Sequence, residues 1–135
     1  MTKESSNNIS LCNILNIRYP IIMAPMFLIS NADMLIEAIN SGITGCIPAH
    51  NYRTDSEFKD AIEMIRKKAS GPIGVNLIVN KSNVKLKQQL NSCLELKVDY
   101  IITSLGSPEK IINACKPLGI KVFCDVVDVK YALKV

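Results

Sequence analysis

Small and polar residues gather at the ends of five predicted strands of this chain. These ends are Ala24-Pro25-Met26, residues 48–51, Asn76, Ser104-Leu105-Gly106 and Asp125. Because parallel strands present their carboxyl ends at one edge of a sheet, these residues are expected to form one ring. Small residues allow a close backbone approach, methionine offers a polarizable face, and an amide can bind a ring edge. This set suits the binding of a planar heterocycle.

Each candidate also has an ordinary structural explanation. Met26 can fill a core, Ser104 can cap the helix that follows it, and Asp125 can cap a loop. Asn76 is the strongest candidate, because an amide inside an apolar strand must be hydrogen-bonded. The single histidine, His50, follows the second strand and is interpreted as a loop or pocket-rim residue rather than a catalytic base.

Apolar runs and amphipathic segments alternate along the chain, and we predict five strands, each followed by a helix. Thr54 and Glu57 form a capping-box signature at the start of the second of these helices. The third of them is expected to bury an apolar stripe that includes Val84. Residues 11–17 form either a helical turn or an antiparallel strand. The predicted strands are 21–24, 44–48, 73–79, 100–103 and 121–126.

Strands that alternate with helices imply an α/β fold with a parallel sheet and right-handed crossovers. An open doubly wound sheet and a (β/α)8 barrel both use this pattern, and periodicity does not choose between them. The chain lacks the motifs with which open doubly wound sheets usually bind their ligands. It has no GxGxxG motif, no GxxxxGK[ST] motif, and no paired acids after the first strand.

Composition favours an ordinary globular domain of 135 residues, with 48% hydrophobic and 21% charged residues and a net charge of +4. Lysines alternate with acids and amides on predicted helices, without aromatic platforms, which argues against nucleic-acid binding. Five scattered cysteines without a CxxC pair indicate reduced thiols and no metal site. No apolar run approaches the roughly 20 residues of a membrane helix. We therefore expect a soluble, cytoplasmic protein with no membrane partner.

Several of these segments resemble one protein family. They are Pro20-Ile21-Ile22-Met23-Ala24-Pro25-Met26, Ser30-Asn31, Pro72-Ile73-Gly74-Val75-Asn76-Leu77 and the fourth strand with its Ser104-Leu105-Gly106 end. Together they are similar to the nitronate monooxygenase family, formerly called 2-nitropropane dioxygenase. That family is related to flavin-dependent enoyl-acyl-carrier-protein reductases. The similarity extends over almost the whole chain after the first ten residues.

The resemblance implies a TIM-type barrel that binds FMN at the carboxyl ends of its strands. Ala24, Pro25 and Met26 would approach the flavin ring, Asn76 would hydrogen-bond it, and Ser104 would lie nearby. The reaction would be the oxidation of an alkyl nitronate by dioxygen to a carbonyl compound and nitrite. The alternatives are an enoyl-acyl-carrier-protein reductase relative and a non-catalytic open-sheet domain.

The family's catalytic histidine and its phosphate-binding loops belong to later strands and match nothing in this sequence, so the catalytic residue is unknown. Residues 1–10 are mostly polar, and we expect them to form a disordered leader. Residues 11–135 are expected to form the first part of one FMN-binding barrel domain, with about five βα units. Without the phosphate-binding loops, such a partial barrel would bind FMN weakly or not at all by itself. Its open sheet edges would favour self-association.

Overall fold

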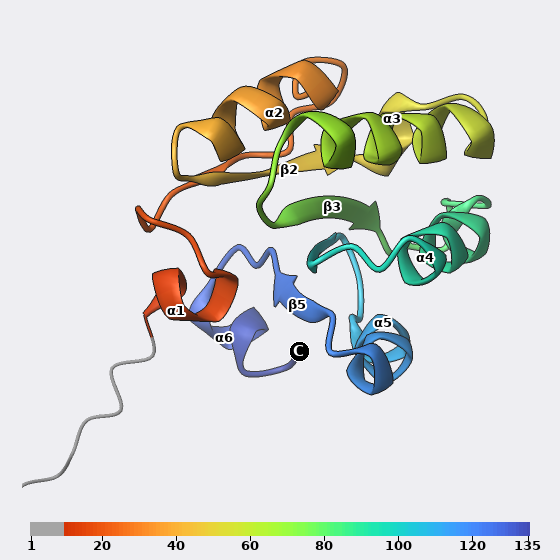
Figure 1. Cartoon of the computed structure of the whole chain (residues 1–135). Helices are drawn as coiled ribbons and strands as arrows, with labels where there is room; N and C mark the ends of the chain where they lie inside the picture. Colours follow the sequence, from red (N-terminus) through yellow and green to blue (C-terminus); the bar gives the residue numbers. More distant parts are fainter. Residues whose placement is uncertain (1–9) are drawn as a thin grey trace, which may run out of the picture.

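The computed structural model describes residues 10–135, and its sheet contains five parallel strands (Figure 1). Their spatial order is the same as their order in the sequence. The predicted leader lies, for residues 1–9, outside the described part, whereas Ser10 is placed and accepts a hydrogen bond from Cys12 N at the start of the first helix. The strands are β1 (Ile22–Met23), β2 (Thr44–Pro48), β3 (Ile73–Ile78), β4 (Tyr100–Ser104) and β5 (Lys121–Cys124).

The strand order decides between the two architectures that the sequence leaves open. An open doubly wound sheet reverses its strand order at a switch point. Here each strand pairs with the next one along the chain, as in a barrel wall. The five strands form a half-barrel, so the predicted partial barrel of α/β class is confirmed.

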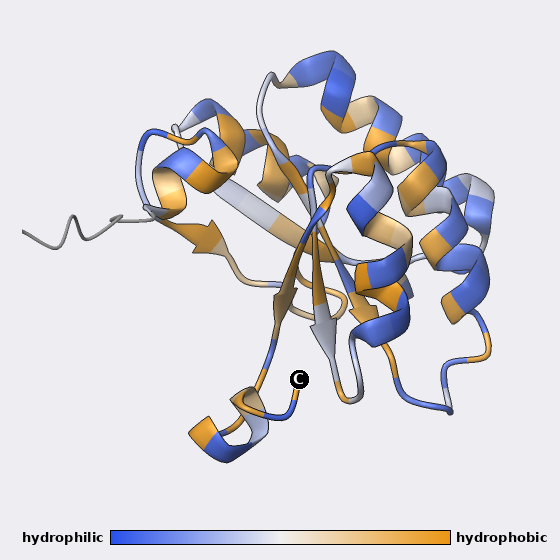
Figure 2. Cartoon of the chain, turned by 90° about the horizontal axis from the view of Figure 1, so that it is seen from below, coloured by the Kyte–Doolittle hydropathy of each residue, from blue (hydrophilic) through white to orange (hydrophobic). Residues whose placement is uncertain are grey.

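Four helices cover the outer face of the half-barrel (Figure 1). Their bounds are α2 (Ala32–Asn40), α3 (Asp55–Lys68), α4 (Leu86–Glu95) and α5 (Glu109–Cys115). The short 3-10 helix η1 (Ala49–Asn51) lies between α2 and α3 in the chain, and η2 (Lys116–Leu118) follows α5. In Figure 2 the strands are largely hydrophobic, whereas the helices carry both hydrophilic and hydrophobic residues. This distribution is that of amphipathic helices on a buried parallel sheet.

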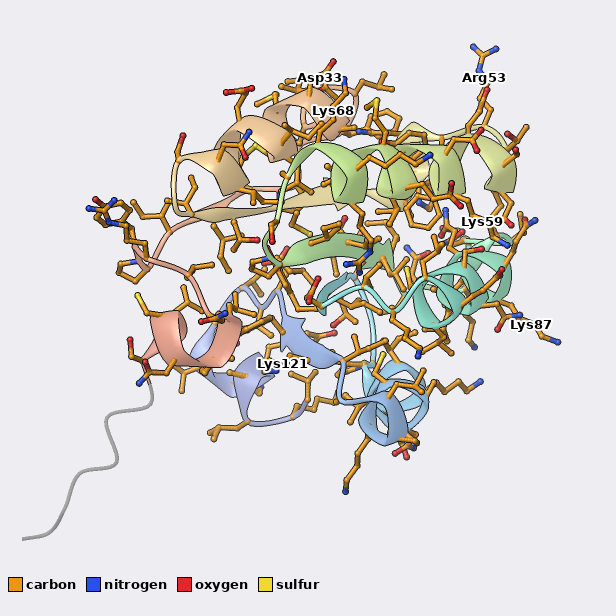
Figure 3. All side chains as sticks on the ribbon, in the orientation of Figure 1. Asp33, Arg53, Lys59, Lys68, Lys87 and Lys121 are labelled. Atoms are coloured by element: carbon orange, nitrogen blue, oxygen red, sulfur yellow. The ribbon has the colours of Figure 1, made fainter. Side chains whose placement is uncertain are left out.

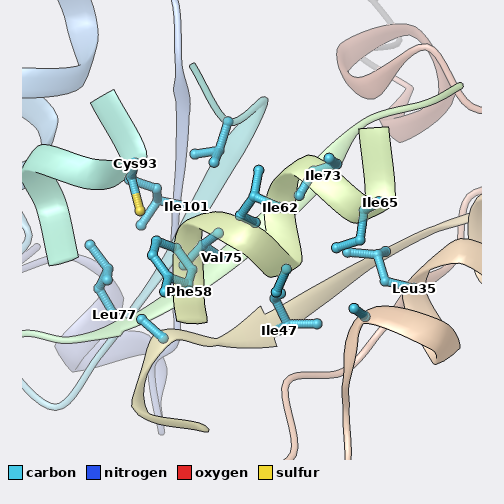
Figure 4. Packing of buried hydrophobic residues seen from close by; sticks show 14 of the residues in the cluster. Leu35, Ile47, Phe58, Ile62, Ile65, Ile73, Val75, Leu77, Cys93 and Ile101 are labelled. Atoms are coloured by element: carbon cyan, nitrogen blue, oxygen red, sulfur yellow. The ribbon is translucent and has the colours of Figure 1, made fainter. Parts of the chain in front are cut away.

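The larger hydrophobic core lies between these helices and the outward-facing strand residues (Figure 4). From α3, the side chains of Phe58, Ile62 and Ile65 enter it, and Ile47 and Val75 meet them from β2 and β3. All five are almost completely buried. The helix that carries the first three starts at the predicted capping box: Glu57 N donates to Thr54 Oγ1, and Thr54 N donates to Glu57 Oε2.

A smaller cluster fills the floor of the inner face. Leu15 from helix α1 (Leu11–Leu15) packs with Cys46 and Tyr100. The ring of Tyr100 meets that of Phe123 edge to face, with 5.6 Å between centroids. Residues 11–17 therefore begin with a helix, and α1 packs on this smaller cluster rather than in the outer layer. The final helix is α6 (Val129–Ala132), which follows β5.

The predicted start of the third outer helix at residue 83 is wrong by three residues. Helix α4 begins at Leu86, and Val84, predicted to be buried, is 92% exposed. The reason lies in Asn83, whose Nδ2 donates to Ile78 O and whose Oδ1 accepts from Lys85 N. These bonds close a turn in place of the first helical turn, so Val84 lies outside the helix and points into solvent.

Charged side chains point outward from the helices, as the alternation of charges predicts (Figure 3). Lys59 of α3 lies 3.3 Å from Asp55 and 2.6 Å from Glu95 of α4, so it links two neighbouring helices. Lys68 and Lys87 are exposed. Within residues 10–135, no helix combines the length and the apolar character that crossing a bilayer requires.

Candidate functional site

Two adjoining hollows lie at the carboxyl ends of the strands. One, of about 410 Å³, is lined by residues from the ends of β1 to β5, among them Pro25, His50, Asn76, Ser104 and Asp125. The other, of about 480 Å³, lies between the ends of β1, β4 and β5. Pro25 and Asp125 line both. Each volume falls in the range of about 300–1,000 Å³ that ligand pockets occupy.

The loop after β1 is held in shape by the hydroxyl of Ser30. This completely buried side chain donates to Ala24 O at 2.7 Å and accepts from Met26 N at 3.0 Å. The loop also contains Leu28 in the left-handed backbone region, with φ of 59°, a conformation that costs an L residue about 1–2 kcal/mol. Fixed hydrogen bonds at both ends of the turn offset that cost.

Asn51 ties the same loop to the end of β2. Its Nδ2 donates to Ser30 O at 2.8 Å, and its Oδ1 accepts from Leu28 N at 2.8 Å. The amide thus satisfies one acceptor and one donor of a loop that would otherwise expose them to solvent. Residues from two strand ends are locked together, and this fixes the wall that Pro25 contributes to both hollows.

Asn76 lies on β3 with its side chain toward the inner face, and it is 7% exposed. Its Nδ2 donates to Ile102 O at 2.9 Å and to Ser104 Oγ at 3.0 Å. Ser104 Oγ in turn donates to Asp125 Oδ2 at 3.3 Å. The ends of three consecutive strands are therefore joined by a chain of side-chain hydrogen bonds.

The predicted cofactor residues do not all occupy the same place. Pro25, Asn76 and Ser104 line the first hollow, and Ala24 lines the second. Met26 lines neither: its side chain is 39% exposed, and its backbone is turned into the loop by Ser30. His50 and Asp125, for which the sequence leaves the role open, lie in the same hollow as Asn76.

Ser30 precedes helix α2 and is of a type that often caps helices, but its hydroxyl binds the loop instead. Asn31 is the cap, since its Oδ1 accepts from Met34 N at 3.0 Å. A serine directly before an asparagine offers two candidate caps, and local sequence does not separate them. Only the return of the loop toward Ala24 reveals what the Ser30 hydroxyl binds.

The floor beneath the hollows contains no reactive group. Burial raises the pKa of the Cys46 thiol far above its usual value, and burial likewise raises the pKa of the Tyr100 hydroxyl. Both groups are therefore neutral over the physiological range. Among residues 10–135, no cluster of three or more histidine, cysteine or acidic side chains is placed to hold a metal ion.

Comparison with known proteins shows the family of the chain. The family model described as nitronate monooxygenase matches residues 8–134 of the chain. The chain belongs to the nitronate monooxygenase family. A probable nitronate monooxygenase from Staphylococcus haemolyticus is 39% identical over 72 residues, which is 53% of this chain and 20% of that protein. The resemblance noted from the strand-end motifs is thereby confirmed.

Solved structures extend the comparison to the fold. FabK from Thermotoga maritima is 26% identical, with a TM-score of 0.84 over 92% of this chain and 39% of that one. A nitroalkane oxidase from Streptomyces ansochromogenes has a TM-score of 0.79 over 93% of this chain and 45% of that one. Its 16% identity supports the fold alone. The chain spans less than half of each of these relatives.

Proposed function

We propose that the protein is an FMN-dependent oxidoreductase that oxidises alkyl nitronates with dioxygen to a carbonyl compound and nitrite. The observation that supports this most is the convergence of Pro25, Asn76 and Ser104 on one hollow, because these residues come from three strands far apart in the sequence. Membership of the nitronate monooxygenase family supports the reaction class.

The residues present fit a flavin ring. The hollow combines apolar walls from Pro25, Pro48 and Ile78 with a single amide at its base, which suits a flat ring with a polar edge. When bound, FMN would supply the electron transfer between substrate and dioxygen. The part of this chain would be to hold the ring at the strand ends and to bind its polar edge through Asn76.

Ala24 and Met26 complete the proposed cofactor residues. Ala24 lines the neighbouring hollow and brings backbone close to it without a large side chain. Met26 would act through its exposed thioether, which can turn onto a ring that enters from solvent. We also propose a cytoplasmic location, and self-association of the chain through its outer strands β1 and β5.

The test is flavin binding followed by product analysis. The purified chain is titrated with FMN and with riboflavin, and flavin fluorescence is measured. Asn76→Ala removes one hydrogen bond to the ring and should weaken binding about tenfold, the effect of about 1.4 kcal/mol. The matched control is Asn91→Ala, because Asn91 is an exposed amide on α4.

Product analysis separates the reactions. With propyl-2-nitronate and dioxygen, the proposed activity releases nitrite in step with oxygen consumption. Reduction of an enoyl thioester by a reduced nicotinamide cofactor, without nitrite, would instead support the enoyl reductase alternative. A colourless protein that gains neither FMN nor riboflavin would refute the flavin site and leave the non-catalytic domain.

A further inference from the structure

We propose that Asp125, acting through Ser104, holds the Asn76 amide so that only its oxygen faces the hollow. A ligand that binds Asn76 must then present a hydrogen-bond donor to that oxygen. This inference rests on the proposed flavin site and names the part of the ring that enters it. Asp125 is a positioning residue here, and Asn76 is the residue that touches the ligand.

Both amide protons of Asn76 are already used. One is donated to Ile102 O at 2.9 Å and the other to Ser104 Oγ at 3.0 Å. The amide oxygen Oδ1 accepts no hydrogen bond from any residue between 10 and 135. Over that same range, no buried side-chain nitrogen or oxygen lacks a partner. Oδ1 is therefore open to the hollow that Asn76 lines.

The direction of these bonds is determined by groups that only accept. Ile102 O is a backbone carbonyl, so it must face the NH2 end of the amide. Ser104 has one proton and can turn it either way, but an ionised carboxylate cannot donate. Asp125 therefore takes the Ser104 proton, at 3.3 Å, and leaves Ser104 only lone pairs to offer to Asn76. A flipped amide would place its oxygen against two acceptors.

A flavin ring has a group that fits this acceptor. Its imide nitrogen N3 carries a proton between two carbonyl groups, and it is the only N–H of the oxidised ring. The remaining polar atoms of the oxidised ring accept hydrogen bonds, and against them Oδ1 would stay unpaired. A site that binds a donor strongly rejects an analogue lacking it, because the buried partner is then left without a bond.

The first experiment compares riboflavin with 3-methylriboflavin, in which a methyl group replaces the N3 proton. Fluorescence titration of the chain should give at least about tenfold weaker binding for the methylated flavin. Asp125→Asn keeps the shape but can donate to Ser104, so the preference should fall to about threefold. Asp60→Asn, an exposed acid on α3, is the control and should keep the full preference. If Asp125 had a merely structural role, Asp125→Asn would weaken the binding of both flavins equally and leave the ratio of their dissociation constants unchanged.

The second experiment needs no flavin. In the 15N-labelled chain, both side-chain amide protons of Asn76 should exchange slowly with solvent, unlike those of Asn91. Asp125→Asn should speed the solvent exchange of the Asn76 amide proton that faces Ser104. Exchange of the Asn76 protons as fast as those of Asn91 would overturn the proposed orientation.

The two experiments separate failure of the inference from failure of the proposed function. Equal binding of riboflavin and 3-methylriboflavin would overturn the donor-edge inference and leave the flavin site standing. Slow exchange at Asn76 together with binding of neither flavin would uphold the orientation of the amide and refute the flavin as its ligand.

Discussion

Gly74 is the residue whose replacement tests the packing of the inner face most directly. It lies opposite Tyr100 in the pairing of β3 with β4. A Cβ at position 74 would lie 2.3 Å from Cζ and 2.4 Å from Cε2 of Tyr100. The ring has no free space to move into: Tyr100 is completely buried, its hydroxyl donates to Gly45 O at 2.8 Å, and Phe123 packs against it.

We expect Gly74→Ala to reduce the free energy of unfolding by about 3 kcal/mol. Overpacking of a tight core costs about 1–3 kcal/mol. A displaced Tyr100 ring also breaks its bond to Gly45 O, and leaving buried partners unpaired costs about 1–3 kcal/mol. The smaller conformational entropy of alanine in the unfolded chain returns about 0.4–1 kcal/mol. Against a total stability of about 5–15 kcal/mol, the variant should fold with a clearly lowered urea midpoint.

A double-mutant cycle in urea gives the decisive measurement. Tyr100→Leu removes the atoms that the new methyl group would meet, so Gly74→Ala should cost much less in the Tyr100→Leu variant than in the wild-type chain. The expected coupling between the two sites is about 2 kcal/mol. Equal costs in both backgrounds would refute the argument that Gly74 makes room for the tyrosine ring.

Three further predictions address other parts of the fold. The backbone N–H of Thr54 is the main cause of the lowered pKa of the Glu57 carboxyl, and the Thr54 hydroxyl adds a smaller contribution. Thr54→Ala keeps the N–H and removes the hydroxyl, so it should raise the pKa of Glu57 slightly in an NMR titration and cost about 1 kcal/mol in urea. Since the folded pKa is the depressed one, the stabilisation from the Glu57 carboxylate is present at neutral pH and is lost as the pH falls through the folded pKa, and an unshifted titration would contradict this. Asn51→Ala should speed hydrogen exchange at Leu28 N without changing exchange in α3, whereas an unaltered rate would mean that Asn51 does not hold the loop. Ellman's reagent should react quickly with the partly exposed thiols and with the buried ones only after unfolding; the first set is Cys12 and Cys124, and the second is Cys46, Cys93 and Cys115.

The sequence predicts the strands and the helix caps well because both depend on neighbouring residues. The run Thr44–Pro48 is a strand with the predicted bounds. Thr54 and Glu57 form the predicted capping box at the start of α3. The prediction fails at Val84 because its surroundings are governed by the Asn83 side chain, which competes with the helix for backbone groups. Periodicity records apolar spacing and does not register such a competition.

The candidate site is predictable in outline but not in its connections. Strand ends can be aligned because parallel strands finish at one edge, and this alignment brings Asn76, Ser104 and Asp125 together. Which atom of each faces the hollow depends on hydrogen bonds between residues 21 to 28 positions apart. Local sequence has no information about such pairs. Met26 illustrates the same limit, since its place depends on a loop closed by Ser30 and Asn51.

The tripeptide Gly74-Val75-Asn76 shows how one strand can serve three layers of the protein. Successive side chains of a strand point to opposite faces, so Gly74 and Asn76 face inward while Val75 enters the outer core. Gly74 admits the Tyr100 ring that forms the floor, and Asn76, one pleat further on, reaches the hollow above it. A shift of one residue in register would turn the amide into the hydrophobic core and valine into the site. The packing of Val75 therefore sets the height and the face at which Asn76 can meet a ligand, and core stability and ligand recognition depend on the same register.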